Sequence, residues 1–151
     1  MRQRWASLWL VLALSAVTPH VLSAQSTPTQ SRQRSSGGLG QNYPNPFNPE
    51  TWIPFSIGEA PNCTDQSRQY RVTLRVYNLL SQLVAVPVLQ GGTGGVAGGQ
   101  PLENVLLTCG QYTAYWDGRY MKSSREVASG IYMYKLDIDG RPFVKKATVM
   151  K

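Results

Sequence analysis

The sequence predicts an all-β fold, a β-sandwich of short strands that follows a leader and a polar linker. Several runs of six to eight residues alternate between apolar and polar side chains, and turn signals such as Asp-Gly separate them. No stretch has the spacing of an amphipathic helix. Residues 41–151 are long enough to enclose one hydrophobic core, so we expect a single folded domain there.

Residues 1–24 have the layout of a secretory signal peptide. Arg2 and Arg4 precede an apolar run at residues 8–17, and Ala24 is the small residue expected before a cleavage. The apolar run is much shorter than the roughly 20 residues of a membrane-spanning helix. We therefore expect export through the Sec translocon, with signal peptidase cutting between Ala24 and Gln25.

Residues 25–40 contain almost no apolar side chains. Such a segment buries too little surface to offset the entropy cost of ordering, so it is expected to be a flexible linker.

The first expected strand covers residues 52–57. Pro54 cannot donate a hydrogen bond to a neighbouring strand, which favours an edge or a bulged strand. In the second, at residues 70–77, Val72, Leu74 and Val76 share one face, as in a strand with one buried side.

The middle of the domain predicts two further strands separated by a loop. Residues 84–88 alternate again through their valines, and residues 111–116 lead into a turn at Asp117-Gly118. The glycine-rich stretch at residues 90–100 between them is expected to be a mobile surface loop.

The last two strands are expected at residues 131–138 and 143–150, joined across Asp139-Gly140. Asp-Gly is a strong hairpin signal because both central positions of a type I′ turn need positive φ. Tyr132 and Tyr134 are predicted to be core residues, and Gly130 to supply an unusual backbone angle before the strand.

Trp116 and the cysteines each have a structural and a functional interpretation. Trp116 at a strand end predicts a buried indole; the alternative is an aromatic platform for sugar binding. Cys63 and Cys109 predict one disulfide, worth about 4 kcal/mol in the chain-entropy model. The alternative, a reactive thiol, would lack a histidine partner.

The composition argues against catalysis and against nucleic-acid binding. The one histidine, His20, lies in the leader, so no histidine remains for general-base chemistry or metal binding. We expect no enzyme activity, no metal site, no cofactor and no small-molecule substrate. The formal net charge is +7, but the basic residues are scattered apart from Lys145, Lys146 and Lys151, so no nucleic-acid partner is expected.

Four blocks of the sequence resemble a known family. The segments QNYPNPFNPETWIPFSI, VTLRVYNLLSQLVAVPV, YWDGRYMKSSREVASGIYMYKL and VKKATVMK follow the order found in the type IX secretion system type A sorting domain. That domain is similar to the immunoglobulin-type domain of the flagellar hook-capping protein (FlgD-like). The resemblance covers residues 39–151. The sequence departs from the family at Ser81, where a glycine is usual.

The resemblance implies an immunoglobulin-like β-sandwich of about seven strands that serves as an address and not as an enzyme. The outer-membrane type IX machinery would recognise the folded domain in the periplasm and deliver it to the cell surface or the exterior. A second hypothesis is a structural or adhesive surface module with the same sandwich and no link to type IX export.

The resemblance also assigns roles to individual residues. The PNPFNP block comprises Pro44, Asn45, Pro46, Phe47, Asn48 and Pro49, and is expected to cap the sandwich with Tyr43 and Phe47 as apolar plugs; a partner-binding proline segment is the alternative. Trp116, Asp117, Gly118, Gly130, Tyr132 and Tyr134 complete the structural motif. Lys145, Lys146, Val149 and Lys151 in the last strand are the expected recognition residues, read by β-augmentation. The alternative is that these lysines protect a sheet edge from aggregation.

Overall fold

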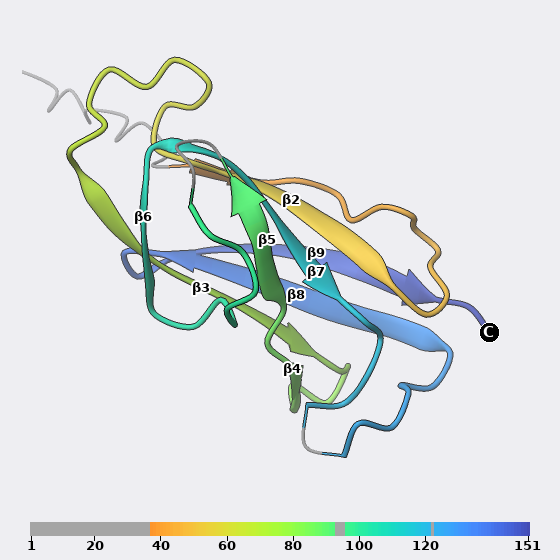
Figure 1. Cartoon of the computed structure of the whole chain (residues 1–151). Helices are drawn as coiled ribbons and strands as arrows, with labels where there is room; N and C mark the ends of the chain where they lie inside the picture. Colours follow the sequence, from red (N-terminus) through yellow and green to blue (C-terminus); the bar gives the residue numbers. More distant parts are fainter. Residues whose placement is uncertain (1–36, 93–95, 122) are drawn as a thin grey trace, which may run out of the picture. The chain divides into compact units, whose positions relative to one another are not determined.

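A computed structural model describes residues 37–92, 96–121 and 123–151, which form nine β-strands and no helix (Figure 1). The strands make two antiparallel sheets, as the alternating sequence predicts. The expected signal peptide with its Ala24–Gln25 cleavage site, and most of the expected linker, lie outside the described residues. Within the described residues, no helix has the length and apolar character needed to span a membrane.

The first sheet has the order β1-β2-β7-β5. Its strands are β1 (Gly37–Leu39), β2 (Thr51–Ile57), β7 (Gly110–Trp116) and β5 (Val88–Gly92). Buried and partly exposed residues alternate along β2 and β7, so each strand has one face in the core and one face outside.

The second sheet has the order β4-β3-β8-β9, and β6 also pairs with β3. Its strands are β3 (Gln69–Tyr77), β4 (Leu83–Ala85), β6 (Val105–Thr108), β8 (Gly130–Ile138) and β9 (Arg141–Val149). Strand β8 pairs with one edge of β3. The other edge is shared: β6 pairs with the start of β3, and β4 pairs with its end.

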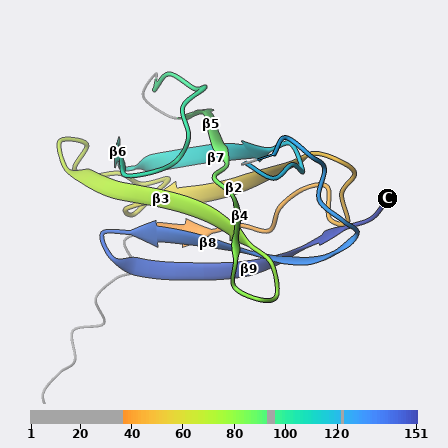
Figure 2. The ribbon, with the colours of Figure 1, turned by 90° about the horizontal axis from the view of Figure 1, so that it is seen from below.

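The β8–β9 hairpin confirms the clearest local prediction. Nine residue pairs align the two strands, which lie side by side over their whole length (Figure 2). Asp139 and Gly140 adopt φ of 50° and 81°, the positive values that the turn requires. Gly130 has φ of 153° at the start of β8, also as predicted.

The folded region begins earlier than the sequence suggests. Residues 37–39, placed in the linker by composition, form β1 and pair with β2 from Ile57 to Phe55. The expectation of an edge or bulged strand at residues 52–57 is therefore wrong, because β2 lies between β1 and β7 and pairs with β7 in a continuous register. Pro54 is accommodated at the point where β1 has just ended.

The strand expected at residues 84–88 is in fact divided between the two sheets. β4 ends at Ala85 beside β3, and β5 begins at Val88 beside β7. The chain crosses from one sheet to the other in the intervening residues, which include Pro87. The valine alternation predicted a continuous strand because it contains no signal for this crossing. Part of the expected glycine-rich loop, up to Gly92, also belongs to β5.

Ser81 occupies a left-handed turn between β3 and β4, with φ of 60°. This is the conformation that glycine adopts at lowest cost. Asn78 holds the turn: its Oδ1 accepts hydrogen bonds from the backbone N–H groups of Leu80 (3.0 Å) and Gln82 (2.9 Å). The side chain at position 78 therefore stabilises a turn in which a residue other than glycine adopts a positive φ.

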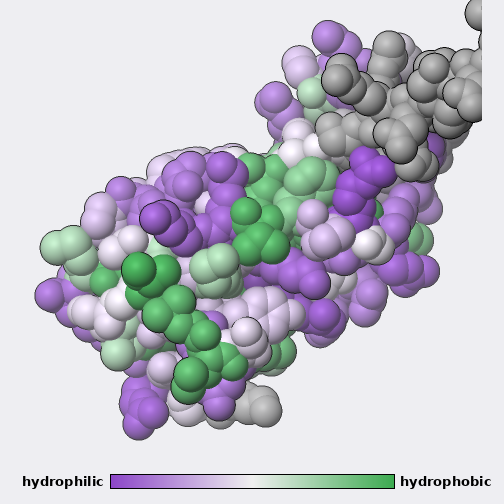
Figure 3. All heavy atoms as spheres, turned by 180° about the vertical axis from the view of Figure 1, so that it is seen from behind, coloured by the Kyte–Doolittle hydropathy of each residue, from purple (hydrophilic) through white to green (hydrophobic). Residues whose placement is uncertain are grey.

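The core lies between the two sheets and is continuous. It includes Val72, Leu74 and Val76 of β3 and Leu136 and Ile138 of β8, all fully buried, together with inward-facing residues of β2 and β7. Figure 3 shows the side turned away from the viewer of Figure 1, where hydrophobic residues form a broken band among hydrophilic ones. Exposed Ile131 of β8 and Val144 of β9 are examples of surface apolar residues.

Cys63 and Cys109 form the predicted disulfide, with Cα atoms 5.7 Å apart. It ties the loop between β2 and β3 to the residue that precedes β7. Gly58 faces this bridge with φ of 67°, and a Cβ atom there would lie 2.8 Å from Cys109 Sγ. Glycine is thus required next to the disulfide for both backbone and steric reasons.

Candidate recognition site at the C-terminal end of the sandwich

Residues 41–50, here called the lead-in, lie beside the C-terminus in Figure 1, at the end of the sheets opposite the β2–β3 loop. The lead-in contains cis peptide bonds before Pro44, Pro46 and Pro49. Most of its side chains are exposed, but Asn42 and Phe47 are buried. These two residues fix the segment to the sandwich by different means.

Phe47 caps the core through aromatic contacts. Its ring centroid lies 5.2 Å from that of Trp116, which in turn lies 5.7 Å from Tyr132 in an edge-to-face arrangement. Trp116 is buried, as predicted, and its indole Nε1 donates to the carbonyl oxygen of Arg119 at 3.1 Å. Because its ring is buried, Trp116 cannot be the sugar platform that its sequence position also allowed. Burial, together with a hydrogen bond to Tyr120, raises the pKa of Tyr132 to about 12.

Asn42 is held by a buried polar network. Its Nδ2 donates to Thr51 Oγ1 (3.0 Å) and to the Pro44 carbonyl oxygen (3.1 Å), and its backbone N–H donates to the Tyr134 hydroxyl (3.0 Å). Thr51 is also buried, and its hydroxyl donates to the same Pro44 carbonyl. Among the described residues, no buried side-chain polar atom lacks a partner, so the network is fully satisfied.

Tyr134 resolves a problem that Pro54 creates. The Gly40 N–H donates to the Pro54 carbonyl at 2.8 Å, as in an antiparallel pair, but Pro54 has no N–H to return the bond. The Tyr134 hydroxyl donates to the Gly40 carbonyl instead, at 2.9 Å. A residue from the second sheet thus completes the hydrogen bonding at the end of β1. Burial raises the pKa of Tyr134, so its hydroxyl keeps its proton.

The lead-in also covers the outer edge of β9. The Phe47 N–H donates to the Thr148 carbonyl (3.0 Å), and the Met150 N–H donates to the Phe47 carbonyl (3.1 Å). Asn45 Oδ1 accepts from the Thr148 N–H, and Gln41 Nε2 donates to the Lys146 carbonyl. The last third of the terminal strand is therefore already paired. Within the part of the chain that the structure describes, no strand pairs with the outward backbone groups of Val144 on this edge.

The turn after Trp116 fits against the lead-in. Gly118 has φ of 68°, and a Cβ atom there would collide with the carbonyl oxygen of Pro49. Asp117 Oδ1 accepts a hydrogen bond from the Arg119 N–H at 3.0 Å, which closes the turn. The Trp-Asp-Gly and Pro-Asn-Pro blocks are thus in direct steric contact.

The chain ends on a charged contact with the loop that precedes β8. Lys151 Nζ lies 2.7 Å from Glu126 Oε2, and the Lys151 N–H donates to Ser129 Oγ at 3.1 Å. The hydrogen bond from Lys151 lowers the pKa of Glu126. This exposed ion pair holds the terminal residue back on the sandwich.

The four expected recognition residues do not form one surface. Val149 is buried in the core, and Lys151 binds Glu126. Lys145 and Lys146 are consecutive strand residues, so their side chains point to opposite faces of the sheet, and Lys146 is the more exposed. Tyr43, expected to be a plug, is instead 53% exposed.

The sequence interpretation missed Asn42 and Thr51, whose burial depends on partners from other strands. It also missed an outward row of aromatic residues, Tyr43, Trp52 and Tyr115, although the inward alternation of β2 and β7 already indicates that Trp52 and Tyr115 face outward. The described residues contain no group of three or more His, Cys, Asp or Glu side chains arranged to hold a metal ion.

Comparisons with protein-family models, with curated proteins and with solved structures find no match for this chain.

Proposed function

We propose that the chain is a non-catalytic exported protein whose β-sandwich, of immunoglobulin-like type, is a sorting and anchoring signal for type IX secretion. One observation carries this proposal. The PNPFNP block is far in sequence from the Trp-Asp-Gly block, the Gly-Ile-Tyr-Met-Tyr block and the terminal strand, yet all four meet at one end of the sandwich. Residues that bear the family resemblance therefore form one structural unit around the C-terminus.

In this proposal the partners are the Sec translocon and signal peptidase during export, and then the outer-membrane type IX machinery. The protein passes through the periplasm and reaches the cell surface or the exterior. The surface available to the machinery comprises Lys146, the backbone of β9 around Val144, which no described strand pairs with, and the exposed side chains of the lead-in. The charge of Lys146 next to an open edge would orient an added strand.

The test must separate recognition from folding. Ala147 and Val149 are buried, so deleting the last seven residues would unfold the sandwich as well as remove the lysines. We therefore choose the double variant Lys145→Glu and Lys146→Glu, expressed as the full chain in a host that has the type IX machinery. Arg71→Glu is the matched control, because Arg71 is an exposed strand residue near the opposite end of the same sheet.

Surface delivery is measured by protease accessibility on intact cells. We expect the double lysine variant to accumulate in the periplasm with an unchanged melting temperature, and the Arg71 variant to reach the surface. Delivery of the lysine variant at the wild-type level would remove the assigned role of the tail. Delivery of the wild-type chain in a host without the machinery would instead favour the adhesive or structural module.

A further inference from the structure

The outer face of the first sheet carries a row of three aromatic side chains. Tyr43 and Trp52 face each other through a pair of backbone hydrogen bonds (2.8 and 2.9 Å), and Trp52 lies directly opposite Tyr115 of β7. The ring centroids are 6.2 Å apart for Tyr43 and Trp52 and 5.6 Å apart for Trp52 and Tyr115. Directly opposite residues share a face, so the row runs across the strands on the solvent side.

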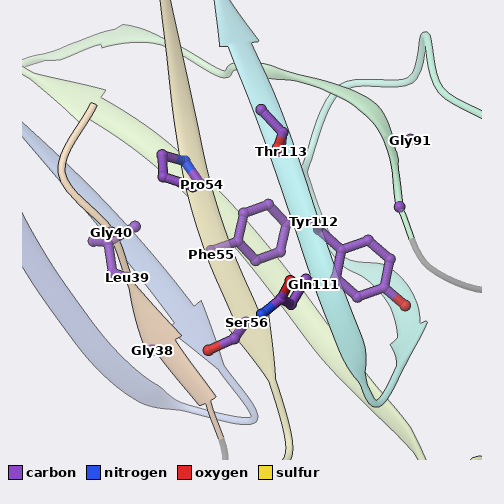
Figure 4. A pocket seen from close by; sticks show the side chains of 11 residues that line it. Gly38, Leu39, Gly40, Pro54, Phe55, Ser56, Gly91, Gln111, Tyr112 and Thr113 are labelled. Atoms are coloured by element: carbon purple, nitrogen blue, oxygen red, sulfur yellow. The ribbon is translucent and has the colours of Figure 1, made fainter. Parts of the chain in front are cut away.

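A hollow of about 640 Å³ lies on the same face, and Figure 4 shows its lining. Pro54 and Thr113 in that lining are the next outward residues along β2 and β7 from Trp52 and Tyr115, so the hollow adjoins the row. Its lining includes Gly38 and Gly40 beside β2, Pro54 and Ser56 on β2, and Gln111 and Thr113 on β7, as Figure 4 shows. Glycine keeps the hollow open: a Cβ atom at Gly40 would lie 2.7 Å from Pro54 Cγ. No charged residue lines this hollow among the described residues.

A second, smaller hollow of about 250 Å³ lies on the other side of the row. Tyr115, Asp117, Arg119 and Tyr120 are among the residues that line it. The outward residues of β7 therefore lead from the first hollow, past the aromatic row, to the second. From Gln111 to Asp117 this path is about 20 Å long, at about 3.3 Å per strand residue.

We propose that this face binds a neutral linear polysaccharide, which packs on the aromatic row and reaches the two hollows beside it. Sugar rings present C–H groups on one face, which pack on aromatic rings, and hydroxyl groups at the rim, which need short polar partners. The aromatic row supplies the first, and Ser56 and Thr113 supply the second. The site shares Tyr43 and Glu50 of the lead-in with the surface proposed for sorting, but it lies on the first sheet, whereas Lys146 and β9 belong to the second. It does not depend on the proposed function.

The carboxylates at the site favour a ligand with many hydroxyl donors. Glu50 accepts a hydrogen bond from the Tyr115 hydroxyl at 2.7 Å, and a carboxylate can accept several more. Asp117 lies 3.9 Å from Arg119 at the far end of the path. A proline-rich peptide also packs on aromatic rings, but its proline residues have no N–H groups to donate to these acceptors. The anionic acceptors likewise disfavour an acidic polysaccharide.

The test uses the purified full chain and isothermal titration with laminarin, xyloglucan and galactomannan as neutral probes. Polygalacturonate and poly-L-proline serve as the acidic and the peptide probes. We expect at least one neutral polysaccharide to bind, with about tenfold lower affinity in Trp52→Ala and about threefold lower affinity in Tyr43→Ala and in Thr113→Val, which keeps the side-chain shape. Tyr77→Ala is the matched control, because Tyr77 is an outward aromatic residue of β3 in the other sheet.

Tyr43→Ala keeps the test decisive if Trp52→Ala fails to fold, since the Tyr43 side chain is 53% exposed. Near-ultraviolet circular dichroism checks the fold of every variant. The proposal is overturned if no neutral probe binds or if folded Tyr43→Ala binds as tightly as wild type. If poly-L-proline binds, loses affinity in the Trp52 variant, and none of the polysaccharides binds, the proposal is overturned in favour of a peptide site.

Discussion

Two loops of similar length close the two ends of the sandwich, and they are anchored in different ways. The lead-in at residues 41–50 buries Asn42 and Phe47 and makes no covalent link. The β2–β3 loop at residues 58–68 buries no side chain fully, and Cys63 fixes it through the disulfide. A covalent bond thus leaves the rest of a loop free to be polar, whereas a non-covalent anchor requires a buried ring and a satisfied polar network.

The largest effect is expected from removing the non-covalent anchor. Phe47→Ala deletes a fully buried ring that packs on Trp116, and should lower the free energy of unfolding by about 3–5 kcal/mol. Urea unfolding measures this. The matched control is Tyr43→Ala in the same segment, whose exposed ring should contribute about 1 kcal/mol or less. Equal effects of the two variants would mean that the lead-in is not anchored by Phe47.

Removal of the covalent anchor should cost nearly as much by another route. The double variant Cys63→Ser and Cys109→Ser opens a loop of 46 residues and should destabilise the fold by about 4 kcal/mol in the chain-entropy model. Hydrogen exchange separates the two cases. In the cysteine variant, the amides of Phe47 and Met150 should exchange with an opening free energy close to that of global unfolding. In Phe47→Ala, the amides at positions 47 and 150 should exchange with a much smaller opening free energy.

Tyr134→Phe tests the polar part of the lead-in anchor. The change removes one hydroxyl and leaves both the Gly40 carbonyl and the Asn42 N–H without their partner, so we expect a loss of about 1–3 kcal/mol. Tyr77→Phe, at an outward position of β3, is the control and should be close to neutral. A neutral result for Tyr134→Phe would show that water replaces the hydroxyl.

The smallest expected effect is a change in the pKa of a carboxylate. It compares Glu126 and Asp65, which lie near opposite ends of the sandwich. Lys151 lowers the pKa of Glu126, and the Ser67 hydroxyl lowers the pKa of Asp65. A folded-state pKa below the unfolded value means that the contribution is present above the unfolded pKa and is lost as the pH falls through the folded one. Carboxylate titration by NMR should therefore show the Glu126 pKa rising in Lys151→Met, while that of Asp65 stays unchanged. High salt should have the same effect on Glu126.

Local sequence patterns predicted the parts of the fold whose partners are close in the chain or whose burial follows from alternation. The β8–β9 hairpin needs only the two positive φ values at Asp139-Gly140 and the period of two on either side. The inward face of β3 is legible for the same reason. The burial of the Trp116 indole and the pairing of the two cysteines were also predicted correctly.

The candidate sites were less predictable because they depend on contacts between distant residues. From the sequence, Asn42 is expected to be an ordinary loop residue, because its partners Tyr134 and Thr51 are identified only in the folded structure. The lysines of the tail form one cluster in the sequence, but strand alternation and the Glu126 contact separate them in space. The outward aromatic row could have been found from alternation, but its neighbours on adjacent strands depend on the sheet order.

By itself, the sequence determined the all-β class, the terminal hairpin, the disulfide and the burial of Trp116, since each follows from a local pattern or from a unique pair of residues. Only the tertiary structure decided that residues 37–39 form a strand, that the chain changes sheets around Pro87, and that the lead-in seals the edge of β9. The physical reason is that a three-residue strand with two glycines has no pattern of its own. Its stability comes from the backbone groups of β2 and from the Tyr134 hydroxyl, which the fold brings to it.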